Sequence, residues 1–289
     1  MNNVKVIAII GMGLMGASLA AALRDKSYSG SIVGWSRSKE TKDKAEKSKW
    51  FDKVFNSASE AVADADLVIF CLPVKSIPKL VEKLSLSFKS NAIITDVGST
   101  KFELINMVEG LLDKSSSTFI GSHPICGSEK SGFEGADPNL YNESITVVCP
   151  SNNNEAYCVV KDLWTFIGSE VVELESNTHD ELLASTSHLP HLVSALLVRT
   201  SLSYPNAINF CGTGFRDTTR LASGSSLVWA DILDSNRESI KEVLQKYKYE
   251  LINLINLLDT GSYNDLQEWL EDSRTMRERV KVSGKLIDE

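Results

Sequence analysis

Continuous runs of β-branched and other apolar residues recur along the first part of the chain, and helical patterns separate them. The apolar runs are typical of strands buried on both faces of a parallel sheet, and they lie at residues 6–10, 31–35, 66–72, 92–96, 118–120, 145–148 and 170–174. Helical spacing of small and apolar residues is clearest at 17–24, 77–84 and 102–112. The alternation predicts an α/β fold with one doubly wound, mostly parallel sheet and helix crossovers on both faces.

The pattern changes near Thr178, after which apolar residues follow long helical periods, clearest at 182–202 and 231–258. We therefore predict a sheet-containing domain at 1–176 and an all-helical domain at 177–289. Two domains agree with a length of 289 residues, since a domain takes roughly 100 to 200 residues.

The second long helical segment carries one apolar stripe. Its members are Ile232, Leu233, Ile240, Val243, Leu244, Leu251, Ile252, Ile255 and Leu258. A stripe of this length can pack within its own chain or against another subunit, and the pattern leaves both alternatives open.

Composition narrows the class of protein. The chain is 43% hydrophobic and 24% charged, which is close to a globular average and predicts that it folds throughout. A net charge of -8 disfavours binding to nucleic acid or to an anionic membrane, so an anionic ligand needs locally placed cations. Five cysteines without a C-x-x-C pair indicate neither a disulfide framework nor a zinc knuckle. No apolar stretch reaches about 18 residues, the length that spans a bilayer, and we expect a cytoplasmic protein.

A glycine-rich turn follows the first predicted strand. Gly11, Gly13 and Gly16 have the G-x-G-x-x-G spacing of a dinucleotide-binding turn, and a strand before and a helix after provide the context that this motif requires. The first glycine makes the tight bend, the second lets the backbone approach a pyrophosphate, and the third allows helix and strand to pack closely. The pyrophosphate would lie at the helix N-terminus, where free N–H groups favour anions. We predict a Rossmann-like domain whose cofactor contacts Gly11, Gly13, Leu14, Met15 and Gly16.

The residues after the second predicted strand bear on which dinucleotide binds. An acidic residue about 20 positions beyond the turn would bind the ribose 2′-hydroxyl of NAD, but Ser36, Arg37 and Ser38 stand there. Hydroxyls and a guanidinium can bind a 2′-phosphate, and no carboxylate repels it. The segment therefore predicts NADP, with NAD as the alternative if Arg37 is only a solvated loop residue. Leu72 and Pro73, after the third predicted strand, are predicted to contact the cofactor as well.

All four histidines lie between residues 123 and 191. His123 follows a predicted strand and begins a segment whose Gly, Pro and Ser content predicts a loop. In open α/β sheets, ligands bind at the carboxyl ends of strands. His188 and His191 are predicted to open a helix with both imidazoles on one face, as pocket residues or as core histidines. Arg216 and Arg220 then bring two cations into an acidic chain.

Taken together, these segments resemble the prephenate and arogenate dehydrogenase family of tyrosine biosynthesis. The segments that carry the resemblance span essentially the whole chain and are the Gly11 turn, Asp96–Lys101, the His123 segment, Ser187–His191, Phe215–Arg220 and Trp229. The resemblance implies a Rossmann domain joined to a helical dimerisation domain, and hence a homodimer. It also implies an NAD(P)-dependent oxidative decarboxylation of a small cyclohexadienol, which yields an aromatic product.

The resemblance also implies roles for single residues. His123 would accept the proton of the substrate's ring hydroxyl as hydride leaves for the nicotinamide, and the ordinary pKa of histidine, about 6.5, suits a neutral acceptor. Ser99 would contact and orient the same hydroxyl. Arg220 would pair with a substrate carboxylate, for which a guanidinium offers both charge and direction.

Other residues would complete the substrate pocket. Those that would line it are Ser128, Glu129, His188, His191 and, nearer its mouth, His179. Arg216 would bind substrate or form an ion pair with Asp217 or another nearby acid. We expect no metal, because a base, an aligned nicotinamide and carboxylate anchors suffice. The histidines also have no carboxylate or thiol at metal-ligand spacing.

The choice of substrate is open. Prephenate carries a keto group where arogenate carries an ammonium, so a suitably placed carboxylate favours arogenate. The segment 128–132 looks like that of prephenate-using bacterial members, which makes prephenate the main prediction. Glu129 could bind an ammonium, and Ser36 with Arg37 looks more like arogenate-using members. Arogenate, or both substrates, is therefore the alternative.

Two other classes of function are alternatives, namely a different dehydrogenase or reductase and a binding protein without catalysis. A β-hydroxyacid dehydrogenase or imine reductase would use a Lys or Asp in the first helix of the second domain, where this chain has His188 and His191. A dinucleotide-binding sensor would not need His123, Ser99 and Arg220, all of which are present.

Overall fold

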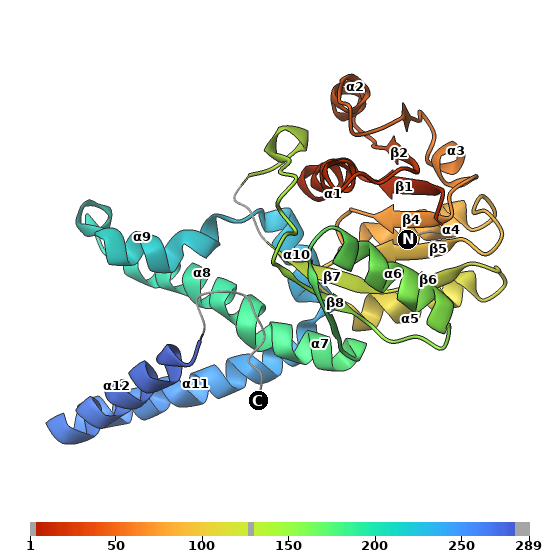
Figure 1. Cartoon of the computed structure of the whole chain (residues 1–289). Helices are drawn as coiled ribbons and strands as arrows, with labels where there is room; N and C mark the ends of the chain where they lie inside the picture. Colours follow the sequence, from red (N-terminus) through yellow and green to blue (C-terminus); the bar gives the residue numbers. More distant parts are fainter. Residues whose placement is uncertain (1–3, 127–129, 281–289) are drawn as a thin grey trace. The chain divides into compact units, whose positions relative to one another are not determined.

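The computed structural model describes residues 4–126 and 130–280 (Figure 1). The chain divides into two compact units, and a short segment from the C-terminal half belongs with the first. The first unit is Met1–Asp180 together with Ser225–Ser235, and the second is Glu181–Gly224 together with Asn236–Glu289. A single domain boundary after residue 176 stays a prediction.

Six parallel strands form the main sheet of the first unit. In spatial order they are β3 (Lys53–Val54), β2 (Ser31–Trp35), β1 (Val6–Ile10), β4 (Leu67–Phe70), β5 (Ile93–Asp96) and β6 (Thr118–Ile120). Every neighbouring pair runs parallel. The central strand β1 is buried from Ile7 to Ile10, as its unbroken apolar run predicts. The predicted doubly wound α/β fold is confirmed.

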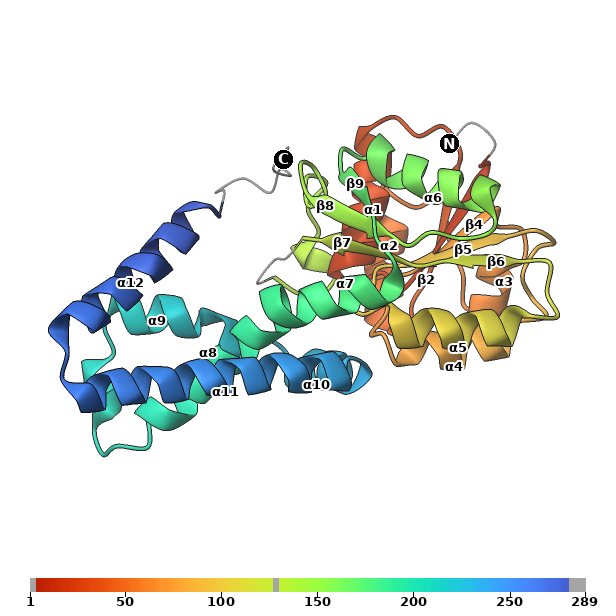
Figure 2. The ribbon, with the colours of Figure 1, turned by 90° about the horizontal axis from the view of Figure 1, so that it is seen from below.

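Helices cover both faces of this sheet (Figure 2). The first face carries α1 (Leu14–Asp25) and α6 (Asn154–Phe166), and the second carries α3 (Ala58–Val62), α4 (Ser76–Leu84) and α5 (Phe102–Leu112). Each face has its own buried apolar cluster, with Leu19 and Trp164 in one and Val81 and Val108 in the other. A further helix, α2 (Lys39–Lys47), buries only Ala45, so its sequence has no apolar stripe to indicate it.

Three further strands form a second sheet. They lie in the order β7 (Ser122–Ile125), β8 (Ile145–Val148) and β9 (Glu170–Glu173), with β7 antiparallel and β9 parallel to β8. The expectation that the runs at 145–148 and 170–174 extend the main sheet is therefore wrong.

The expectation of a loop at His123 is wrong as well. His123 pairs with Val147, and Pro124 pairs with Thr146, so both belong to strand β7. A proline fits there because β7 is an edge strand, where a missing N–H leaves no ladder hydrogen bond unmade. Strand β7 ends at Ile125.

The second unit is built from helices. A π-turn (Ala184–His188) follows α7 (Ser176–Leu183) without a break and continues into α8 (Leu189–Ser201). Ser187–His191 therefore lies inside a continuous helical segment, which corrects the expectation that it opens a helix. Pro190 stands in the first turn of α8, directly after the π-turn. Its missing N–H is tolerated there because the π-turn already departs from the regular α-helical hydrogen-bond pattern.

The remaining helices of this unit are α9 (Thr213–Thr219), α11 (Arg237–Thr260) and α12 (Tyr263–Glu278), whereas α10 (Ser226–Ser235) belongs to the first unit. The predicted helix at 231–258 is thus two helices, because Asn236 leaves helical geometry with φ −122° and ψ 34°. Within the part of the chain that the structure describes, no helix is both long and apolar enough to span a membrane.

Candidate active site

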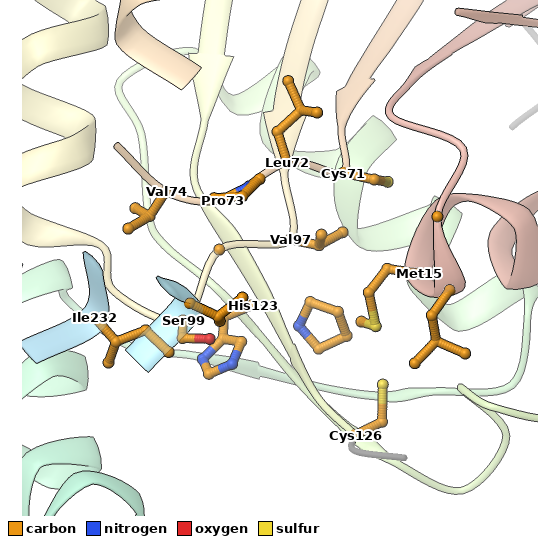
Figure 3. A pocket seen from close by; sticks show the side chains of 15 residues that line it. Met15, Cys71, Leu72, Pro73, Val74, Val97, Ser99, His123, Cys126 and Ile232 are labelled. Atoms are coloured by element: carbon orange, nitrogen blue, oxygen red, sulfur yellow. The ribbon is translucent and has the colours of Figure 1, made fainter. Parts of the chain in front are cut away.

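A pocket of about 390 Å³ opens at the carboxyl ends of β1, β4 and β5 (Figure 3). Ligands bind at this edge in open α/β sheets. The pocket is lined by residues that follow these three strands, by side chains of β7, and by part of α10. It brings together seven residues that the sequence singles out, namely Gly13, Leu14, Met15, Leu72, Pro73, Ser99 and His123. Their roles as cofactor and substrate contacts stay predictions.

The turn between β1 and α1 contains two glycines that packing requires. Gly11 has φ +104°, and a Cβ there would lie 2.3 Å from the carbonyl oxygen of Cys71. A Cβ on Gly16 would lie 2.0 Å from the carbonyl oxygen of Gly11. Gly13 differs, because nothing lies within 4 Å of its Cβ position, although it lines the pocket.

The turn therefore has open space at the glycine where a pyrophosphate would approach the backbone. Helix α1 begins directly after Gly13 and has no acidic residue in its first turn, so nothing there opposes an anion at its N-terminus. On these two observations the residues fit a dinucleotide.

The segment after β2 leads directly into α2. Ser36 is half-buried and Arg37 is exposed. Ser38 is the N-cap of α2, and its Oγ accepts a hydrogen bond from the Thr41 N–H at 3.3 Å. Ser38, which is predicted to contact the 2′-phosphate, therefore already caps this helix. Arg37 precedes the same helix N-terminus, whose N–H groups also favour an anion.

A buried ion pair holds the turn that carries Ser99. Asp96, the last residue of β5, pairs with Lys101, and both side chains are fully buried. The Asp96 carboxylate also accepts hydrogen bonds from the N–H groups of Gly98 at 2.7 Å and Ser122 at 3.1 Å. Burial raises the pKa of Asp96, and Lys101 with the two N–H groups counters that effect. The turn is fixed from both ends, and Figure 3 shows the Ser99 hydroxyl beside the imidazole of His123.

His123 is hydrogen-bonded to a second histidine. Its Nδ1 lies 2.8 Å from Nε2 of His179, and the two rings are inclined by 74°. Nδ1 of His179 lies 2.7 Å from Oδ1 of Asp180. The Asp180 carboxylate also accepts hydrogen bonds from the N–H groups of Lys101 at 2.8 Å and Phe102 at 3.0 Å. His179 is fully buried, which corrects the expectation that it lies near the pocket mouth.

Asp180 is a site residue that the sequence reasoning missed. The available signal is its position beside one of only four histidines, since a carboxylate next to an imidazole can orient it. The bond from His179 to His123 spans 56 positions and arises from the tertiary structure alone.

Two other predicted pocket histidines are buried in the second unit. Nδ1 of His188 lies 3.2 Å from Nδ2 of Asn236, and that side chain is itself buried. Burial lowers the pKa of His191, while a hydrogen bond with the Leu221 backbone acts in the opposite direction. The environment of the His191 imidazole therefore disfavours its charged form.

The two predicted arginine anchors also lie in the C-terminal half. Arg216, in α9, is exposed and donates from Nη1 to the Cys211 carbonyl at 3.5 Å. Arg220 begins a short 3-10 turn (Arg220–Ser223) that packs against α8. There, Ser194 Oγ accepts a hydrogen bond from the Ala222 N–H at 3.0 Å. The Arg220 turn thus lies beside α8, the helix that contains His191.

Two predicted substrate contacts, Ser128 and Glu129, lie outside the described residues. Within residues 4–126 and 130–280, no three or more His, Cys, Asp or Glu side chains are grouped to hold a metal ion. Cys126 lines the pocket, and burial raises the pKa of its thiol to about 12. It is therefore a neutral thiol near pH 7 and not a reactive thiolate.

Known proteins match this chain over nearly its whole length. The family model of the prephenate dehydrogenase nucleotide-binding domain matches residues 19–173, and that of the prephenate dehydrogenase dimerization domain matches residues 175–272. Prephenate dehydrogenase of Bacillus subtilis (strain 168) is 30% identical over 99% of this chain and 79% of its own length.

Solved structures agree with the sequence matches. Prephenate dehydrogenase from A. aeolicus, in complex with hydroxyphenyl propionate and NAD+, has a TM-score of 0.90 at 30% identity, over 96% of this chain and 98% of that one. Arogenate dehydrogenase from Synechocystis has a TM-score of 0.82 at 28% identity, over 95% of this chain and 99% of that one. With both family models matched in order along the sequence, the chain belongs to the prephenate dehydrogenase family.

Proposed function

We propose that this chain catalyses the NAD(P)-dependent oxidative decarboxylation of prephenate to 4-hydroxyphenylpyruvate, with NADP as the preferred cofactor. The observation that carries the proposal is that Ser99 and His123 share one pocket with the glycine turn. A hydroxyl and an imidazole thus lie next to a backbone with room for a pyrophosphate. The names of the Bacillus and A. aeolicus relatives support prephenate as the substrate.

Each polar group of the pocket has a task in this chemistry. A bound nicotinamide supplies the hydride acceptor. His123 accepts the proton that leaves the ring hydroxyl, and Ser99 hydrogen-bonds this hydroxyl and orients it toward the imidazole. The ring carboxylate departs as CO2 and the ring becomes aromatic, so no covalent bond between enzyme and substrate is needed. Arg220, Arg216, His188 and His191 stay proposed substrate contacts, because the family motifs contain them.

The preference for NADP rests on the segment after β2. Arg37 is exposed directly before the α2 N-terminus, so its guanidinium and the helix N–H groups offer two kinds of phosphate contact. The acidic residue in the first turn of this helix, Glu40, is ion-paired with Lys44 at 2.7 Å, which reduces its repulsion of an anion.

A two-by-two assay tests the proposal. Purified protein is incubated with prephenate or arogenate and with NAD or NADP, and the absorbance of the reduced nicotinamide is followed. We expect the highest kcat/KM with prephenate and NADP. A preference for arogenate would support the alternative that the Synechocystis relative and Glu129 favour. Turnover with neither substrate would contradict the proposed function and support a binding protein without catalysis.

We also propose that the chain forms a homodimer through its second unit. The dimerization-domain model matches residues 175–272. In the single chain, α11 leaves a row of apolar side chains between 45 and 59% exposed, namely Leu251, Ile252, Ile255 and Leu258. A second copy would bury this row.

A further inference from the structure

The position of the proton on the His179 ring can be deduced from its hydrogen-bond partners. Asp180 accepts hydrogen bonds from the N–H groups of Lys101 and Phe102 through its two different oxygens, so its carboxylate is fixed in orientation. Its Oδ1 also lies 2.7 Å from Nδ1 of His179. A carboxylate can only accept there. His179 therefore carries a proton on Nδ1.

The same logic sets the proton on His123. A neutral His179 with its proton on Nδ1 has its lone pair on Nε2, which lies 2.8 Å from Nδ1 of His123. The His123 nitrogen must then donate, so His123 carries its proton on Nδ1 and its basic lone pair on Nε2. Because His123 lines the pocket, Nε2 is the nitrogen that can accept a proton from a ligand there.

We propose that His179 and Asp180 are positioning residues for His123. They fix its tautomer and ring orientation, and the Asp180 carboxylate stabilises the positive charge that arises when Nε2 of His123 takes the proton of the ring hydroxyl. The bond from oxygen to hydrogen breaks, the new bond forms at Nε2, and the charge is shared along the two imidazoles toward the carboxylate. The catalytic part rests on the proposed function, whereas the proton positions do not.

The hydrogen-bonded chain of His123, His179 and Asp180, here called the relay, is anchored to the turn that carries Ser99. Asp180 binds the N-terminus of α5 through the backbone of Lys101, and the Lys101 side chain pairs with Asp96. Ser99 lies in the turn between that pair. One connected network therefore places the base and the hydroxyl that orients the substrate, as outer partners orient catalytic groups in other sites.

Other charged groups near the relay do not replace Asp180. Lys101 and Asp96 balance one another in a fully buried pair, and Glu175 is exposed. Burial raises the pKa of the Cys149 thiol to about 12, which keeps it neutral. The carboxylate that is hydrogen-bonded to His179 is that of Asp180.

The first experiment reads the proton positions without any substrate. The full-length protein is labelled with 15N at its histidine rings, and long-range 1H–15N correlations identify which nitrogen of each neutral ring carries the proton. Only four histidines are present, and His179→Gln and His123→Asn assign the two rings. We expect His123 and His179 both to carry the proton on Nδ1. A proton on Nε2 of either neutral ring would overturn the proposal.

The second experiment measures the effect on turnover of prephenate and NADP. His179→Leu removes the relay, and we expect kcat to fall by about 10²-fold, the lower end of what a general base contributes, with the KM for prephenate and the Kd for NADP unchanged. His179→Gln keeps an acceptor for His123 and a donor for Asp180, so we expect it to recover about tenfold of that loss. Equal kcat in both variants would overturn the proposal.

Asp180→Asn tests the charge. Without the carboxylate, protonated His123 is less stable, so the acidic limb of the kcat/KM pH profile should move to lower pH. Asn153→Ala is the matched control, since it removes the N-cap of α6, which accepts from Ala156 N–H at 3.1 Å. Its pH profile should equal that of the wild type. An unmoved limb in Asp180→Asn, with NADP binding intact, would overturn the role of the charge.

The two proposals can fail separately. If the wild type turns over neither prephenate nor arogenate, the proposed function fails, and the ring-proton measurement still decides the relay. If the wild type turns over prephenate while His179→Leu keeps full kcat, the relay fails and the function stands.

Discussion

Lys101 links the two halves of the candidate site through two different groups. Its ammonium pairs with Asp96, and its backbone N–H donates to Asp180. A lysine with no exposed surface is rare, because burial opposes its charge unless a partner compensates. This single residue therefore ties the turn of Ser99 to the histidine relay.

Removing the Lys101 ammonium should destabilise the fold. Lys101→Met leaves the Asp96 carboxylate buried without its counter-ion, and we expect the free energy of unfolding to fall by about 3 to 5 kcal/mol, measured by urea denaturation. Lys241→Met breaks an exposed pair with Glu238 at 2.9 Å and is the matched control, for which a far smaller loss is expected. Equal losses in the two variants would contradict the structural role of the buried pair.

His191 should make stability depend on pH. Burial lowers its pKa in the folded chain, so near pH 6 the folded state binds fewer protons than the unfolded state. Its contribution to stability is then complete above the ordinary pKa of about 6.5 and is lost as the pH falls below it. We expect His191→Gln to show a smaller drop in the free energy of unfolding than the wild type between about pH 7.5 and 5.5. An identical drop in both proteins would contradict this.

Arg37 should decide the choice of dinucleotide. Ser36→Asp combined with Arg37→Ala removes the phosphate contact and adds a carboxylate for the ribose hydroxyls, so the ratio of kcat/KM for NADP over NAD should fall by about tenfold or more, about 1.4 kcal/mol. Steady-state kinetics with both cofactors measures the ratio. A wild type that already prefers NAD would show that the segment after β2 does not bind a phosphate.

At the scale of elements, the strand, turn and helix that begin the chain combine two different uses of glycine. Gly11 and Gly16 are needed because backbone atoms approach them closely, whereas Gly13 faces open space in the pocket. The first kind of glycine maintains the fold, and the second leaves room for a ligand. The two kinds can be separated by experiment.

Gly16→Ala and Gly13→Ala form a matched pair. A methyl on Gly16 meets a carbonyl oxygen at 2.0 Å, and we expect a loss of about 1 to 3 kcal/mol in stability from overpacking. A methyl on Gly13 meets nothing within 4 Å, so stability should hold while NADP binding weakens by about tenfold or more, about 1.4 kcal/mol. Thermal unfolding and fluorescence titration measure the two effects. Unchanged NADP affinity in Gly13→Ala would contradict the cofactor site.

Elements that carry a buried apolar run or an apolar stripe are the ones that the sequence predicts well. The apolar runs at 6–10, 31–35 and 118–120 match β1, β2 and β6, and the helix at 102–112 matches α5. Elements that bury little are missed, because their residues carry no apolar periodicity. Helix α2 buries only Ala45. Strand β7 is not predicted because Pro124 is typical of a loop, although an edge strand tolerates proline.

At the scale of the whole molecule, the sequence locates the pieces of the site but not their pairing. Ser99 and His123 are each indicated by a local motif, and they meet in one pocket. The bond from His123 to His179 connects positions 56 apart, and no local pattern encodes it. The sequence does not predict that Ser225–Ser235 belongs to the first unit either. The helical spacing of apolar residues continues across Asn236, and no Gly or Pro marks the break there.

The apolar stripe of α11 changes character along its length. Its N-terminal part is buried at Ile240 and Val243, whereas Leu251, Ile255 and Leu258 are 48, 49 and 59% exposed in the single chain. The sequence leaves packing within the chain and packing against another subunit as alternatives. Packing within the chain explains why the first part of the stripe is apolar. Burial against a second copy would explain the rest.

Charges placed on the exposed part should therefore separate the copies. Leu251→Glu with Ile255→Glu adds two negative charges to apolar positions that a dimer would bury without partners, and we expect the mass measured by light scattering to fall from two chains to one. Lys246→Glu changes the net charge by the same amount at an exposed position on the opposite side of α11, and it should remain a dimer. The wild-type Tm should rise with protein concentration, and that of the double variant should not. A wild type that is already monomeric, or a double variant that keeps the mass of two chains, would contradict the proposed interface.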